Sequence, residues 1–273
     1  MSERGATPEF PDWEIKEQFD YADTLTLPEW GWEFLRRNPN YRKSWESAQR
    51  DFTVGARSGA ARVIEATNPA TALLEWGCLY SSAPILNARS AIVFWQPDLC
   101  PKVLRLTALP LSSAIAAEAF CLRELKCPSV LLRGFTDAQH LLFRDRGRGL
   151  QLAVHGPDIL DPVRLVADSA PGYVFARDQF RSLRCFMDLR LSGKLMPSHF
   201  QREALSPRLK HVLRALDGAL AGASHREIGT ALFGEERIRA EWTARGRPLR
   251  YKVRRAVHRG YELMRGGYRG FLR

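Results

Sequence analysis

The chain has 273 residues, of which 45% are hydrophobic, so it can fill a sizeable core and is not disordered throughout. Its net charge of +11 lies almost entirely in the C-terminal quarter: residues 196–273 hold 17 Lys and Arg against 7 acids, whereas residues 1–195 hold 24 against 23. This asymmetry favours a polyanionic partner, nucleic acid before a membrane, because attraction to phosphates grows with the number of cations presented.

The cysteines and the apolar segments indicate the cellular compartment in which the protein is expected. Five cysteines, without a CxxC pair, predict reduced thiols. The first residues, MSERGATPEFPDW, include acids and lack the apolar stretch of a signal peptide. The most apolar window, residues 103–122, is interrupted by Arg105, Pro110 and Glu118, so it does not predict a membrane span. We therefore expect a soluble, cytoplasmic protein with no membrane partner.

Residues 1–50 form an aromatic-rich N-terminal segment. Pro28 favours the start of a helix, and Asn38 with Pro39 favours its end. We expect short helices held together by tryptophan packing in this first domain.

Residues 51–195 predict an α+β middle domain with a small mixed sheet and flanking helices. From residue 51 to about residue 88 the pattern is weak, which favours a loop with one short helix. Further on, β-favouring runs and a turn at residues 145–149 predict strands, and two stretches have helical character. The strands are expected at 91–95, 129–135, within 138–156 as a pair around the turn, and at about 163–167. The helices are expected at 112–125 and 177–193.

Residues 196–273 are expected to form a C-terminal, all-helical domain. Ser206 as N-cap and Pro207 at the first helical position predict one helix start. Ser224 and Glu227 have the spacing of a capping box, in which each side chain accepts a hydrogen bond from the other residue's backbone N–H. This second helix ends at Gly234. A short segment, 235–242, precedes the last helix, which starts at Pro248.

The last helix has two unlike faces at 100° per residue. One face is apolar and needs a partner to bury it. The opposite face and its flanks are cationic, and no acid lies between Glu241 and Glu262. Three linked helices with a basic last helix are typical of a helix-turn-helix, in which arginine bonds guanine in the major groove and other cations contact phosphates. The predicted contacts with double-stranded DNA are Arg247, Arg250, Tyr251, Lys252, Arg254, Arg255, His258 and Arg259.

Two alternatives remain open at this point. The basic face could be solvated or could dock a protein partner. The segment 235–242 could instead enter the groove, because the connection from Gly234 to Pro248 is longer than the tight turn of about 3–4 residues that usually joins the last two helices.

Two stretches resemble known families. Residues 214–242, RALDGALAGASHREIGTALFGEERIRAEW, followed by VRRAVHRGYELMRGGYRGFL at 253–272, resemble the DUF2285 family of proteobacterial proteins. Residues 28–45, PEWGWEFLRRNPNYRKSW, resemble the short DUF6499 segment that often precedes it. The resemblance implies a helix-turn-helix variant in a transcriptional regulator of integrative and conjugative elements.

The same resemblance implies two different partners. Full-length members activate genes for excision and transfer of the element, whereas short members without the N-terminal part are antiactivators that bind the activator. This chain has both segments and so resembles an activator. Its N-terminal segment is then a candidate surface for RNA polymerase or a partner regulator, and the alternative is a packing cap over the middle domain, because tryptophans such as Trp30 and Trp32 are usually buried.

The sequence does not favour an enzyme. Six histidines show no HExxH or paired-ligand spacing, and RDRGRG lacks the Gly-Lys-Ser/Thr of a phosphate loop. No GxSxG is present. The spacing of the aspartates between residues 137 and 168 is what loops ordinarily provide. We therefore expect no catalytic residue, no metal and no cofactor, and a scaffold role for the middle domain.

Overall fold

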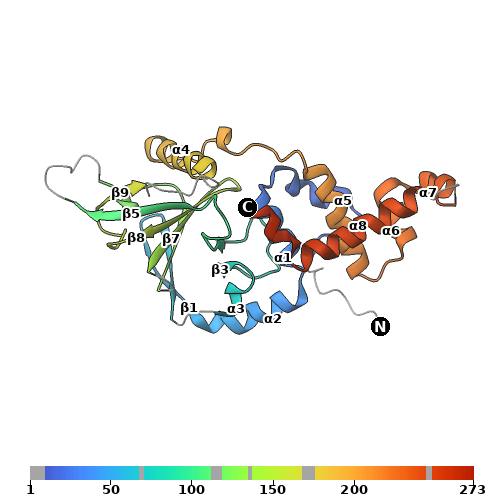
Figure 1. Ribbon diagram of the computed structural model, residues 1–273, viewed down its shortest axis with the longest axis horizontal. Helices are drawn as coiled ribbons and strands as arrows, with labels where there is room; N and C mark the ends of the chain where they lie inside the picture. Colours follow the sequence, from blue (N-terminus) through green and yellow to red (C-terminus); the bar gives the residue numbers. More distant parts are fainter. Residues whose placement is uncertain (1–9, 68–70, 112–118, 135–136, 168–175, 244–247) are drawn as a thin grey trace, which may run out of the picture. The chain divides into compact units, whose positions relative to one another are not determined.

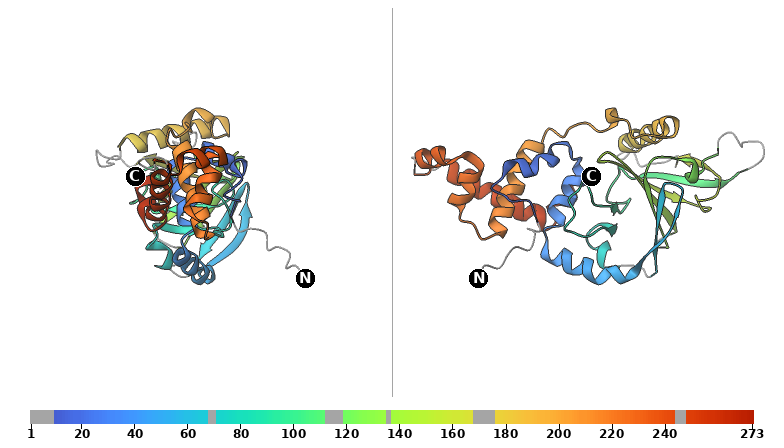
Figure 2. Two further views of the ribbon diagram at one scale, coloured as in Figure 1. Left: turned by 90° about the vertical axis from the view of Figure 1, so that its right-hand side faces the viewer. Right: turned by 180° about the vertical axis from the view of Figure 1, so that it is seen from behind.

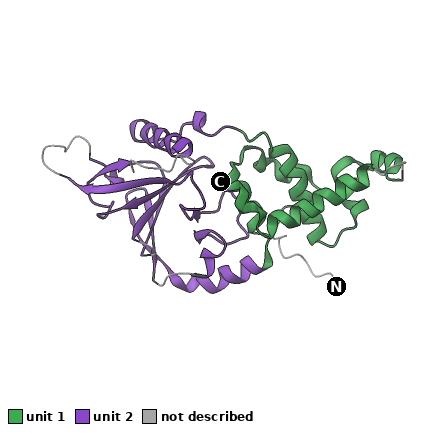
Figure 3. Cartoon of the chain, in the orientation of Figure 1, with its two compact units in different colours: residues 1–39, 202–271 green, residues 40–201, 272–273 purple. Residues whose placement is uncertain are grey.

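The computed structural model describes residues 10–67, 71–111, 119–134, 137–167, 176–243 and 248–273. The chain divides into two compact units (Figure 3). Residues 1–39 and 202–271 form what we call the helical unit, and residues 40–201 and 272–273 form the sheet unit. The two ends of the sequence therefore share the helical unit. The division into domains 1–50, 51–195 and 196–273 stays a prediction.

The sheet unit is built on a mixed seven-stranded sheet (Figure 1). Its strands are β1 Phe52–Ser58, β2 Ala61–Ala66, β5 Leu104–Pro110, β6 Ser129–Arg133, β7 Ala138–Asp145, β8 Arg148–His155 and β9 Val163–Ala167. They lie in the order β1-β2-β6-β7-β8-β5-β9, parallel at β2/β6 and β5/β8 and antiparallel elsewhere. The α+β class expected from the sequence is confirmed.

Local sequence explains the central hairpin. β7 and β8 are joined through Arg146 and Gly147, which both have positive φ, 48° and 77°. A two-residue turn of this kind matches the right-handed twist of the strands that it joins, and glycine adopts the conformation without strain. The predicted strand pair around residues 145–149 is confirmed.

Side chains alternate along the strands and so reach two cores. On one face, Leu141 and Phe143 of β7 pack with Phe186 of α4, Ala176–Ser192. On the other face, Leu142 packs with Phe94 from a separate strand pair, β3 Cys78–Ser81 and β4 Val93–Trp95. Helix α4 lies along one side of the large sheet in Figure 1. The sheet is therefore covered on both faces.

The helical unit contains helices from both ends of the chain (Figure 2). Its elements are η1 Lys16–Thr24, α1 Leu27–Leu35, α5 Ser206–Leu220, α6 His225–Phe233, α7 Glu235–Glu241, α8 Pro248–Met264 and η6 Gly267–Phe271. The other short elements of the chain are α2 Pro39–Ala48, η2 Gln49–Asp51, α3 Thr71–Leu74, η4 Leu122–Glu124 and η5 Pro197–His199. Among the residues described, no helix combines the length and apolar character needed to cross a membrane.

The helix predicted at 112–125 is wrong where the structure describes it; residues 112–118 lie outside the described part. Phe120 pairs with Val163 of β9 in an isolated β-bridge, and residues 122–124 form only the 3-10 turn η4. Phe120 and Leu122 both enter the core beneath α4. A spacing of two places both side chains there in an extended chain, so tertiary packing overrides the helical preference.

The weak pattern at 51–88 concealed strands β1, β2 and β3. β1 is an edge strand with largely exposed residues, so it lacks a clear apolar alternation. β2 is short and pairs with β6, which follows it by more than sixty residues. The expected short helix exists as α3.

The prediction that Ser206 is an N-cap is wrong. Ser206 is the first residue of α5, and its hydroxyl accepts a hydrogen bond from Trp30 Nε1 at 3.2 Å.

Candidate nucleic-acid interface

Helix α8 has one face fixed by packing. Val253 and Val257 enter a core with Ala215 of α5 and Ile228 of α6. α5 and α8 lie side by side (Figure 2). The register of the buried residues repeats every three or four positions, as the sequence predicts. The buried residues of α8 are Leu249, Val253, Val257, Gly260, Leu263 and Met264.

Two glycines permit the helices of this unit to approach closely. A Cβ at Gly260 of α8 would lie 2.8 Å from Leu216 Cβ of α5. A Cβ at Gly229 of α6 would lie 2.9 Å from Ile238 Cδ1 of α7. Both distances are shorter than a carbon–carbon contact of about 3.5–4.0 Å, so a side chain at either position displaces its neighbour. The orientation of α8 therefore depends on small residues at its contacts.

The opposite face of α8 is exposed and cationic. Because the buried face is fixed, these side chains are directed away from the core of the helical unit. Arg247 lies outside the described residues. The other predicted contacts are all exposed: Arg250, Tyr251, Lys252, Arg254, Arg255, His258 and Arg259. We call these seven residues the basic face.

The charge of the basic face is unevenly neutralised. Arg259 lies 3.3 Å and His258 3.5 Å from carboxylate oxygens of Glu262. Arg254 stacks on the Tyr251 ring, with its guanidinium carbon 4.8 Å from the ring centroid. Within the described part of the chain, no ion pair or side-chain hydrogen bond joins the remaining cations to another side chain. These remaining cations are Arg250, Lys252 and Arg255, all in the first half of α8.

Helices α6 and α7 form a tight connection before α8. Ser224 and Glu227 make the predicted capping box: the Ser224 hydroxyl accepts from Glu227 N at 3.3 Å, and Glu227 accepts from Ser224 N at 2.7 Å. Gly234, with φ of 88°, ends α6 and begins α7. Here α6 and α7 meet through a single glycine, a shorter connection than the turn of about 3–4 residues in a helix-turn-helix, so that motif stays a prediction.

The arginines of α7 are compensated within the helix. Arg237 pairs with Glu241 at 2.9 Å, and Arg239 pairs with Glu235 at 2.8 Å. α7 carries three acids against these two arginines. Attraction to phosphate therefore favours α8 over α7 as the surface that meets a polyanion.

The sequence did not predict a buried ion network that joins the N-terminal segment of the chain to α5. Arg37 donates to both carboxylate oxygens of Asp217, at 2.5 and 2.8 Å, and to Glu33 Oε2 at 2.8 Å. Arg36 donates to the same Glu33 oxygen at 2.8 Å. The Arg37 side chain is fully buried. Burial alone would lower the pKa of Arg37, but the charge and hydrogen bonds of Asp217, together with Glu33, raise it above its usual value.

The segment before α1 is held on α5 by two further cations. Lys210 Nζ lies 2.8 Å from Asp20 and 3.0 Å from Asp23. Arg214 donates to the backbone carbonyl oxygens of Trp13 at 2.9 Å and Glu14 at 3.0 Å. These two cations of α5 are therefore engaged inside the helical unit.

The tryptophans of α1 belong to the core. Trp30 and Trp32 are buried, and Trp30 and Phe34 stack with centroids 6.2 Å apart. The expected burial of these tryptophans is confirmed. The Trp30 hydrogen bond to Ser206 lies within the helical unit, and a cap over the middle domain stays a prediction.

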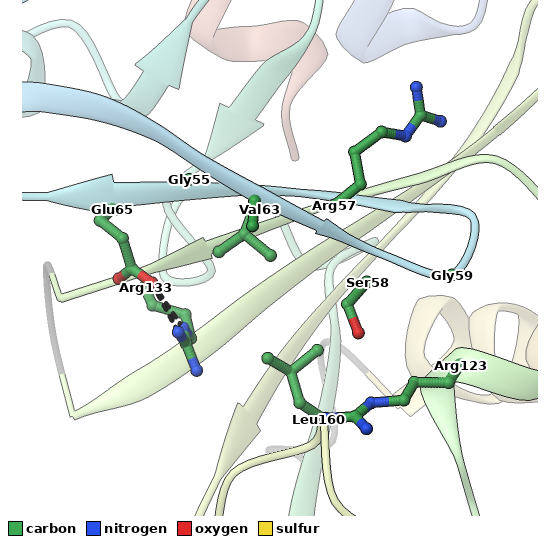
Figure 4. Close-up of a pocket in the computed structure, with 10 residues that line it drawn as sticks. Gly55, Arg57, Ser58, Gly59, Val63, Glu65, Arg123, Arg133 and Leu160 are labelled. Carbon is green, nitrogen blue, oxygen red and sulfur yellow. Dashed lines mark hydrogen bonds and ion pairs between the residues drawn. The ribbon is translucent and has the colours of Figure 1, made fainter.

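A pocket of about 470 Å³ lies in the sheet unit, beside the hairpin of β1 and β2 (Figure 4). Figure 4 shows the side chains of Ser58 and Arg123 directed toward the space beside Leu160. Arg133, in its wall, is paired with Glu65 at 2.5 Å and with Asp158. None of the predicted DNA contacts lines this pocket. Among the described residues there is also no group of three metal-ligating side chains.

A compact helical unit that presents unneutralised arginines on an exposed helix has the build of a nucleic-acid-binding domain. Residues 176–273 match the family described as the T6SS transcription factor DNA-binding domain. Residues 12–80 match the proteobacterial transcriptional regulator-like domain. The protein is a transcriptional regulator with a DNA-binding domain. None of the curated proteins matches the chain.

The first match begins at α4 and ends at the C-terminus, so it contains the whole basic face. The second covers α1 and α2 and ends within β3. Neither match is to DUF2285 or DUF6499.

Proposed function

We propose that this regulator recognises a specific site in double-stranded DNA by inserting α8 into the major groove and activates transcription from a nearby promoter. The observation that carries the proposal is the set of exposed cations in the first half of α8, which no acid among the described residues neutralises. An α-helix with its side chains is about 10–12 Å across, and the major groove is about 12 Å wide, so the two fit.

The proposal divides the basic face by role. Arg254, Arg255, Tyr251, His258 and Arg259 face the DNA. Arginine can bond guanine O6 and N7 with two parallel hydrogen bonds, which specifies the base. The flanking cations fix the register of the helix through phosphates, without specifying sequence. These flanking residues are Arg247, Arg250 and Lys252.

The target and the type of regulation come from the resemblance to DUF2285. On that basis the regulated genes control excision or transfer of a mobile genetic element. If residues 1–50 contact RNA polymerase or a partner regulator, the buried tryptophans of α1 are not available for it. The exposed residues before them, such as Ile15 and Glu17, are the surface that this contact would use.

Binding of the purified protein to random genomic fragments across a salt series tests the proposal. We expect a steep fall in affinity with salt and enrichment of one short motif. A flat, weak response would contradict it and would favour the alternative, a regulator that binds another transcription factor as an antiactivator or co-regulator.

Arg255→Ala separates specific readout from general attraction. If Arg255 bonds a base, the substitution costs about 1–3 kcal/mol of affinity for the selected site and relaxes the preference at one position. Arg239→Ala is the matched control, because Arg239 is an exposed arginine of α7 already paired with Glu235. Fluorescence anisotropy with the selected duplex measures both. Equal losses in the two variants would contradict α8 as the reading helix.

A further inference from the structure

Helix α4 exposes three large apolar side chains. Phe180, Met187 and Leu191 are 68%, 46% and 85% exposed. Single exposed apolar residues are common on protein surfaces, but a cluster of large ones is typical of an interaction site. The three lie on one helix, so their arrangement can be worked out.

The three side chains form one stripe. Spacings of seven and four residues place Phe180, Met187 and Leu191 within about 40° of one another at 100° per residue, with Arg184 at the edge of the stripe. The face that α4 buries against the sheet is centred about 180° away. Its residues are Ser182, Cys185, Phe186 and Leu189. The helix is therefore apolar on two opposite faces, and one of them has no partner among the described residues.

Polar contacts prevent α4 from turning this stripe inward. Gln179 donates to the carbonyl oxygens of Pro101 at 2.5 Å and Val103 at 2.7 Å, and accepts from Arg105 N at 3.0 Å. Ser182 donates to Lys102 O at 2.8 Å. These bonds hold the same side of the helix as the buried apolar residues, so the stripe stays exposed.

One flank of the stripe is cationic. Arg177, Arg181 and Arg184 are exposed, and within the described part of the chain none of them makes an ion pair. Asp188 on the same flank is engaged by His199 at 2.6 Å. The surface therefore combines an apolar centre with uncompensated positive charge.

We propose that this face of α4 docks an acidic amphipathic helix of a partner protein. Apolar residues of the partner at positions i, i+3 or i+4, and i+7 would cover Phe180, Met187 and Leu191, and its acids would meet the three arginines. A second copy of this chain would bring like charges together, which costs affinity. DNA phosphates would pair with the arginines and leave the apolar stripe uncovered.

The test uses the full chain and a fluorescent amphipathic peptide with leucines at helical spacing and glutamates on the flanks. We expect saturable binding by anisotropy that weakens with salt. Leu191→Ser should weaken it about tenfold, as loss of a central interface side chain does. Val54→Ser is the matched control, since Val54 is 62% exposed on β1. Circular dichroism of each variant checks that the fold is retained.

A charge swap makes the test specific. The double variant Arg181→Glu with Arg184→Glu should no longer bind the glutamate peptide and should bind an otherwise identical peptide with lysines in place of the glutamates. The control variant, Lys43→Glu with Arg50→Glu, should bind the glutamate peptide as the unchanged protein does. No binding, or binding indifferent to the swap, overturns the proposal. A dimer of the chain alone that Leu191→Ser abolishes also overturns it. So does a result in which the charge-swapped variant loses affinity for DNA and the unchanged protein does not bind the glutamate peptide. Intact DNA binding together with lost peptide binding supports it, independently of the proposed role of α8.

Discussion

The stability of the helical unit depends on the buried charge of Arg37. Its guanidinium is enclosed and held by carboxylates from α1 and α5, far apart in the sequence. A buried pair of this kind is a weak source of net stability, because both ions are taken out of water. Removing one partner is different, since it leaves an uncompensated charge in the core.

Asp217→Asn should therefore destabilise the protein strongly. The substitution keeps the size of the side chain but removes the charge that faces Arg37, and we expect a loss of about 3–5 kcal/mol in the free energy of unfolding. Urea denaturation measures it. Asp98→Asn is the control, because Asp98 forms a similar pair with Arg105 at 2.7 Å with its side chain 88% exposed. That exposed pair should contribute about 0–1 kcal/mol, and a comparable loss in both variants would contradict the argument.

At the scale of elements, the position of α8 is decided by its contact with α5. Gly260 faces Leu216 of α5, and no side chain fits at Gly260 without displacing Leu216. The direction in which the basic face points is therefore set by the buried residues on the opposite side of α8. On the proposed role of α8, a change that moves this helix would alter DNA binding even though every cation of the basic face is retained.

Gly260→Ala tests this, because the sign of its effect is diagnostic. In a solvent-exposed helix, alanine in place of glycine stabilises by about 1 kcal/mol. At Gly260 we expect the opposite, a loss of about 1–3 kcal/mol from overpacking against α5, together with weaker DNA binding. Thermal unfolding and anisotropy are the measurements. Gly270→Ala in η6 is the control, since nothing lies within 4 Å of a Cβ at that position. A stabilising effect of Gly260→Ala would contradict the argument, because it would show that α5 and α8 can accommodate a methyl group between them.

At the scale of the whole molecule, the helical unit that carries the basic face is not a contiguous stretch of sequence. Residues 1–39 supply α1, with Trp30 and Trp32 buried, and share a compact unit with residues 202–271. Deleting the N-terminal segment to look for an activation surface would therefore also remove part of the core that supports α8.

A chain lacking residues 1–39 should lose the cooperative structure of α5 and α8. The buried apolar surface of α1 and the partners of Asp217 would be missing, so α5 and α8 would lose much of the tertiary packing that stabilises helices in proteins. Hydrogen exchange read by mass spectrometry should show these helices unprotected. The amides of β7 and β8 in the same sample serve as the internal control and should stay protected. Protected α5 and α8 would show that the N-terminal segment is dispensable for folding.

Features that depend on neighbours in sequence could be predicted from the sequence alone. The capping box at Ser224, the β7/β8 turn and the two faces of α8 all arise between residues a few positions apart. The candidate DNA contacts followed from the same periodicity, and the structure places the described ones on one exposed surface. Their contact with DNA stays a prediction.

Only the tertiary structure decided which distant segments meet. The pairing of β2 with β6 and the bond between Arg37 and Asp217 leave no local pattern, because each partner by itself resembles a surface or loop residue. The orientation of α4 likewise depends on its hydrogen bonds to the chain before β5. Folding brings these groups out of water together, and the free energy of that step depends on both partners at once, so neither stretch of sequence specifies it alone.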